Sequence, residues 1–98
     1  MPATLVDIGT LVTRVPGLRG GRPIIAGTGI SVRTIAEESN RGCSPEEIVT
    51  DRPHLTLAQV HAALAYYFAN KQEIDEDIRA EEQAYEEGAR SSGLPVRS

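Results

Sequence analysis

The residues that could carry catalysis or hold a metal ion are few in this chain of 98 residues, and they form no catalytic pattern. His54 and His61, the only histidines, lie seven residues apart, whereas a zinc-binding pair on one helix needs a spacing of four. Cys43 is the only cysteine and has no base beside it in the sequence. We therefore predict no active site, no metal ion and no cofactor, and we assign none of these three residues a catalytic or metal-binding role.

The glycine-rich segment 20–30 has the composition of a loop that could cradle a phosphate group. It lacks the Lys-Ser or Lys-Thr ending of a nucleotide-binding phosphate loop. Glycines also permit the tight turns that end short strands, and this interpretation fits the segment better. Arg22, which lies among these glycines, stays a candidate for contact with an anion or a partner.

The net charge of −4 is distributed unevenly along the chain. Residues 1–52 carry six arginines and six acidic residues and are neutral overall. The other half holds eight acidic residues, all between Glu73 and Glu87, where Arg79 is the only basic residue. Contact with nucleic acid needs local positive charge, so only the first half could make it. The acidic segment suits a basic protein surface, and a solvated helix face is the alternative interpretation.

Two short strands are predicted before residue 30, over residues 10–15 and 23–26, with a turn at Pro16-Gly17 between them. A ribbon of two strands is marginally stable at best by itself. It must therefore lie on helices or pair with a second copy of the chain.

Helices are predicted after residue 30, because each start carries a residue suited to the N-cap. Ser31 caps the first helix, which Gly42 closes with a positive φ. Ser44 begins a second helix with a capping box and must stop before Pro53. Thr56 begins a third helix with another capping box.

The third helix is predicted to be long, because no Gly or Pro interrupts the sequence until Gly88. It would then run for about thirty residues, far longer than a globular domain of this size can cover. Its apolar positions continue at Ile74, Ile78 and Tyr85, close to the seven-residue repeat of a partner-facing seam.

Two short helices and a longer third, joined by short turns, have the layout of a helix-turn-helix domain. We therefore predict a mainly α fold, with a short N-terminal β-ribbon and a long C-terminal helix. The residues assigned to DNA contact are Arg22, Arg33, Arg52, His54, Thr56 and Gln59. A three-helix bundle that touches no DNA stays open, because no Arg or Lys lies between residues 53 and 70.

Several linked motifs resemble those of a known family: Gly20-Gly21-Arg22-Pro23-Ile24-Ile25-Ala26-Gly27-Thr28, Ile30-Ser31-Val32, Gly42, Ser44-Pro45-Glu46-Glu47-Ile48, Pro53-His54-Leu55-Thr56 and Val60-x-x-Ala63-Leu64-x-Tyr66-Tyr67. Over about residues 14–75 the chain resembles the domain-of-unknown-function family DUF433. The resemblance implies a homeodomain-like helix-turn-helix protein and an antitoxin of a type II toxin–antitoxin pair. The usual partner is a PIN-like ribonuclease toxin. Gly29 departs from the family pattern, which has Arg after Gly-Thr.

The implied function is an antitoxin that neutralises a PIN-like toxin protein and binds its own operator DNA as a homodimer or a higher toxin–antitoxin complex. We expect a head over residues 1–70 and an acidic, amphipathic extension over residues 71–98. The residues assigned to toxin binding are Tyr67, Ile74, Ile78, Arg79, Tyr85 and Arg90. The alternative is an interaction module or oligomeric adaptor that binds no DNA. No apolar run could span a membrane, and we expect a cytoplasmic location.

Overall fold

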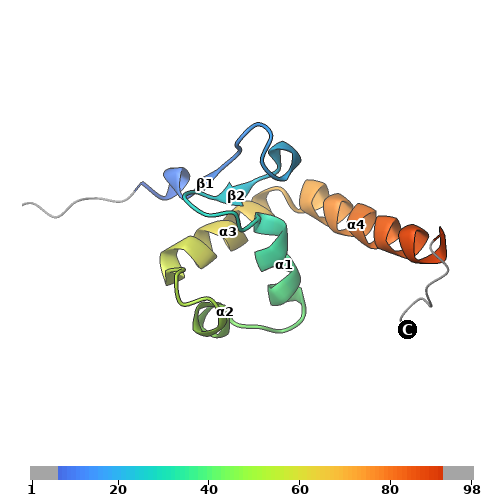
Figure 1. Cartoon of the computed structure of the whole chain (residues 1–98). Coiled ribbons are helices and arrows are strands. Elements are labelled where there is room, and N and C mark those ends of the chain that lie inside the picture. The colour runs from blue at the N-terminus through green and yellow to red at the C-terminus, as the bar shows by residue number, and fades with distance from the viewer. Residues whose placement is uncertain (1–6, 92–98) are drawn as a thin grey trace, which may run out of the picture.

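The structure is a computed structural model, which describes residues 7–91 and the side chains of residues 7–88. Its elements in chain order are the 3-10 turn η1 (Ile8–Thr10), β1 (Val12–Thr13), the 3-10 turn η2 (Arg19–Gly21), β2 (Ile24–Ile25), α1 (Val32–Asn40), α2 (Pro45–Asp51), α3 (Leu57–Ala69) and α4 (Lys71–Ser91). The mainly α fold with a small N-terminal ribbon is thus confirmed (Figure 1).

The ribbon is shorter than the sequence predicted. β1 pairs with β2 in the antiparallel sense, with Val12 opposite Ile25 and Thr13 opposite Ile24. Asp7 explains the late start of β1, because its carboxylate accepts the N–H of Gly9 and holds residues 8–10 in a 3-10 turn. The ribbon contacts α3, so it has the first of the two supports that the sequence left open, packing on helices.

The predicted helix starts are confirmed. The hydroxyl of Ser31 accepts the N–H of Thr34 at the start of α1. Complete capping boxes begin α2, through Ser44 and Glu47, and α3, through Thr56 and Gln59. After α1, Gly42 adopts a φ of +97°, which glycine tolerates far better than any residue with a side chain.

The core lies between α1, α2 and α3, and it also receives one residue of α4. Its fully enclosed members include Ile25 from β2, Ile35 from α1, Ile48 from α2 and Val60 from α3. Ile74, one turn into α4, is 0% exposed and belongs to the same cluster. The first part of α4 is therefore packed as part of the globule.

The prediction of one continuous third helix was wrong, because the helix ends at Ala69 and α4 begins at Lys71. Asn70 separates them with a φ of −129° and a ψ of 39°, outside the helical region. Its side-chain amide donates to the carbonyl of Tyr66, which satisfies one acceptor at the end of α3. Figure 1 shows α4 leaving the other helices as a projecting rod, and the molecule measures 62 × 29 × 23 Å.

Candidate functional site

The arginines assigned to DNA contact all lie beside a carboxylate. Arg22 lies 3.3 Å from Asp77, and Arg33 lies 3.1 Å from Glu37 one helical turn further on. Arg52 lies 2.6 Å from Glu38. A phosphate group would therefore have to compete with an acidic side chain of the same chain at each of these positions.

The pair of Arg52 and Glu38 is the most enclosed of these contacts. Both Nε and Nη2 of Arg52 donate to the same oxygen of Glu38, which is 8% exposed. The contact joins α1 to the residue that ends α2. Removing Arg52 would leave the carboxylate of Glu38 poorly solvated and without its partner, so this pair has a structural role.

The remaining DNA candidates lie around the turn that precedes α3. Thr56 and Gln59 use their side chains to cap the helix, since each accepts a backbone N–H of the other. His54 is exposed in the turn. These three lie within a few residues of Arg52, whereas Arg22 contacts α4, so the structure does not gather the six candidates into one surface.

Sequence reasoning missed Arg14, which holds α4 from the end of the ribbon. Its guanidinium donates to a carboxylate oxygen of Glu73 and, at 3.0 Å, to the hydroxyl of Tyr66. These contacts raise the pKa of Arg14, with the hydrogen bond to Glu73 as the largest cause. Glu73 and Asp77 are one turn apart, so Arg14 and Arg22 contact adjacent turns of α4. No local pattern indicates this pairing, because Arg14 and Glu73 are 59 residues apart.

Two of the residues assigned to toxin binding are buried inside this chain, which corrects their assignment as surface anchors. Tyr67 is 1% exposed and Ile74 is 0% exposed. The Tyr67 hydroxyl donates to Asp75 at 2.7 Å and accepts from Asn40 at 3.3 Å, so it joins α1, α3 and α4. Lys71 lies 5.5 Å from the centre of the Tyr67 ring and donates to Asp75. Because the helix is interrupted at Asn70, the apolar side chains Tyr67 and Ile74, which were predicted to face a partner, pack inside this chain instead.

Asp75 is also part of this cluster, and the pKa of its carboxyl group lies below the ordinary value. The hydrogen bond from Lys71 is the largest cause, and the hydrogen bond from Tyr67 is the second. The carboxylate is therefore held in its charged form as a structural group.

The other candidates for toxin binding lie further along α4. We call residues 71–78 the proximal half of α4 and residues 79–91 its distal half. Ile78 is half-buried against the core at the end of the proximal half. Arg79 is exposed and Tyr85 is 62% exposed, whereas the side chain of Arg90 lies outside the described residues. The acidic residues of the distal half are Glu81, Glu82, Glu86 and Glu87, and all four are exposed.

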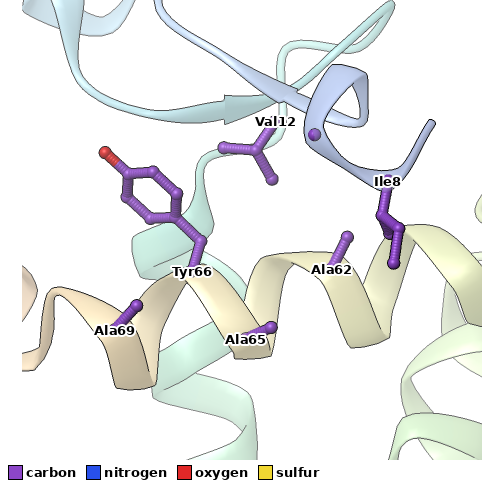
Figure 2. Close-up of a pocket in the computed structure, with 7 residues that line it drawn as sticks. Ile8, Val12, Ala62, Ala65, Tyr66 and Ala69 are labelled. Carbon is purple, nitrogen blue, oxygen red and sulfur yellow. The ribbon is translucent and has the colours of Figure 1, made fainter.

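An open apolar groove of about 370 Å³ lies between α3 and the N-terminal segment. Its lining residues are Ile8, Gly9, Val12, Ala62, Ala65, Tyr66 and Ala69. Figure 2 shows Ile8 and Val12 above the alanines of α3. Its one side-chain hydroxyl, on Tyr66, accepts from Arg14. The groove therefore offers apolar contact and no cluster of reactive groups.

Within residues 7–91, no group of three or more His, Cys, Asp or Glu residues is placed to hold a metal ion. In the same part of the chain, no helix has both the length and the apolar character needed to cross a membrane.

Comparison with known proteins gives one family and one solved structure. Residues 12–67 match the family model described as "Protein of unknown function (DUF433)". The chain is also similar to a DUF433 member protein from Anabaena variabilis ATCC 29413, known from a crystal structure at 2.00 Å resolution. That similarity has a TM-score of 0.67 at 31% sequence identity and covers 71% of this chain and 69% of the other. A search of curated proteins found no match.

Proposed function

This chain belongs to the DUF433 family, and we propose that it acts as an antitoxin that captures a basic partner protein through the distal half of α4. The partner we propose is a PIN-like ribonuclease, whose surface must be basic where it holds RNA. The proposal places the protein in the cytoplasm, where such a toxin meets its RNA.

The observation that carries this proposal is the exposed, acidic and projecting distal half of α4. Four glutamates lie there with Tyr85, an aromatic side chain that is 62% exposed. Aromatic residues with one polar end are frequent anchors of protein interfaces. A row of carboxylates attracts a basic surface and speeds its encounter with the helix.

Binding to operator DNA is a second function, supported by the order of α1, α2 and α3 and by the exposure of His54 before α3. It has the weaker support of the two, because Arg22, Arg33 and Arg52 are engaged with acidic residues. A gel shift with DNA from the region upstream of its own gene tests it. Sequence-specific binding that falls steeply with salt would support operator binding, and no shift, with or without partner, would favour the interaction module.

The test of the antitoxin proposal uses the full chain and the protein encoded by the neighbouring reading frame. We expect the wild-type chain to bind that protein and to suppress its ribonuclease activity. Tyr85→Ala is expected to weaken binding at least tenfold, the size of effect typical of an interface anchor. The double variant Glu81→Lys, Glu82→Lys is expected to weaken it further at low salt.

The matched control is Asp51→Lys, which reverses an exposed charge at the end of α2. It is expected to leave binding unchanged. Full binding and full inhibition by the variants of the distal half would place the contact elsewhere and overturn the proposal.

A further inference from the structure

The outer face of α3 is apolar, carries no formal charge and is uncovered in the monomer. Leu57 is 43% exposed and Phe68 is 64% exposed. Between them lie His61, which is exposed, and Leu64, which is half-buried against the core, at spacings that put all four on one side of a helix. From Leu57 to Ala69 the sequence contains no Asp, Glu, Lys or Arg. A helix that is apolar on nearly all sides is normally enclosed, so this face lacks a partner.

The apolar surface extends beyond the row of large side chains. Ala65 and Ala69 are exposed beside that row and border the groove shown in Figure 2. Ile8, at the far edge of the groove, is 67% exposed. The apolar face therefore extends from Leu57 and Phe68, across α3, to Ile8.

We propose that this face of α3 binds the same face of a second copy of the chain. Each copy carries a net charge of −4, so two copies repel each other unless they meet on a neutral surface. The distal half of α4 is strongly acidic and cannot meet its own copy, whereas α3 is uncharged. A basic partner finds no complementary charge on α3. The occupant that fits is therefore another α3, and this inference does not rest on the antitoxin proposal.

A two-fold axis across the middle of α3 gives a self-complementary contact. With the two helices antiparallel, Leu57 of one copy lies beside Phe68 of the other, and His61 lies beside Leu64. Small residues at Ala65 and Ala69 let the helix axes approach to about 8 Å, the near end of ordinary helix packing. The antiparallel arrangement also sends the two acidic α4 helices toward opposite ends of the dimer.

The size of the face agrees with a dimer of modest affinity. A helix of 13 residues is about 20 Å long. It offers less than the roughly 800 Å² that each partner buries in a standard interface, so the rim at Ile8 must contribute. We expect a dissociation constant in the micromolar range, about the weak end of specific association.

Sedimentation velocity on the full chain across a range of concentrations tests the inference. The wild-type chain is expected to shift from monomer to dimer as its concentration rises. Ala65→Glu puts a carboxylate on the face, at a position that is exposed in the monomer, and is expected to weaken dimerisation at least tenfold. The matched control, Ala80→Glu, makes the same change at an exposed position of α4 and is expected to dimerise nearly as the wild type does.

A mixing experiment separates loss of the contact from loss of the fold. Ala65 lies two residues from the midpoint of α3, so the two-fold axis brings its two copies near each other. Ala65→Glu and Ala65→Lys are each expected to be monomeric, and an equimolar mixture is expected to recover dimer as a mixed species. A wild-type chain that stays monomeric throughout would overturn the inference, and so would a dimer that Ala65→Glu leaves intact.

Discussion

The two halves of α4 each carry four acidic residues but lie in opposite surroundings. In the proximal half, Glu73, Asp75 and Asp77 each lie beside a basic side chain of the same molecule, and Ile74 is enclosed. In the distal half, the glutamates are exposed and Tyr85 extends into solvent. Acidic side chains of the first two turns therefore help to hold the helix to the globule, whereas the distal half carries the surface that we propose binds a partner.

The largest difference between the halves concerns apolar side chains. Ile74→Ala is expected to lower the free energy of unfolding by about 2–4 kcal/mol, because it opens a cavity in the core. Tyr85→Ala is expected to change it by less than about 0.5 kcal/mol, since an exposed side chain loses little packing. Urea denaturation measures both. Equal costs at the two positions would remove the distinction between a packed and a projecting half.

The Tyr67 hydroxyl gives a finer comparison, with Tyr85 as its matched control. Tyr67→Phe removes a buried group that bonds both Asp75 and Asn40, and we expect a loss of about 1–2 kcal/mol in the free energy of unfolding. Tyr85→Phe makes the same chemical change on the distal half and is expected to have almost no effect. If Tyr67→Phe also has no effect, the hydroxyl does not help to hold α4.

The contact between Arg14 and Glu73 is expected to contribute less. A double-mutant cycle with Arg14→Ala and Glu73→Ala should give a coupling of about 0.2–1 kcal/mol, because both side chains are nearly half exposed. The coupling should fall as salt rises. Arg14→Ala combined with Glu82→Ala, a residue of the distal half, should be additive. Coupling in the second cycle would mean that Arg14 acts at long range.

The smallest expected effect is the pH dependence contributed by Asp75. Its pKa is lowered in the folded state, so its contribution is complete above the unfolded value of about 3.9. The contribution is lost as the pH falls through the lower folded value. Asp75→Asn should therefore lower stability near neutral pH and match the wild type more closely in acid. A loss of stability in Asp75→Asn that is the same in acid as at neutral pH would contradict the assignment.

Features that depend only on neighbouring residues could be predicted from the sequence. The caps at Ser31, Ser44 and Thr56 and the positive φ of Gly42 depend on contacts within a few positions. The same is true of the first two helices. Their positions fix the order of the bundle, so the fold class could be predicted as well.

Features that depend on distant residues could not be predicted. Residues 57–87 have the composition of one helix, and the local sign of its end, Asn70, is a residue type that also occurs inside helices. The sequence predicted one surface through Ile74 and Tyr85, because both residues lie on the same side of a straight helix. The break lets the first turns of α4 pack on the globule, so Ile74 is enclosed, whereas Tyr85 lies about three turns further along the projecting helix and is exposed. The acidic partners of Arg22 and Arg52 likewise come from other elements. That these two arginines are paired with carboxylates is therefore visible only in the three-dimensional structure.

The break at Asn70 and the contacts of the first two turns together decide the direction in which α4 projects. A helix of 21 residues reaches about 32 Å from that point. One degree of rotation at the base would then displace the far end by about 0.5 Å, by the same helical rise. A small change in those contacts would therefore displace Tyr85 relative to the globule, so the position of the proposed toxin-binding residues is set far from where they lie.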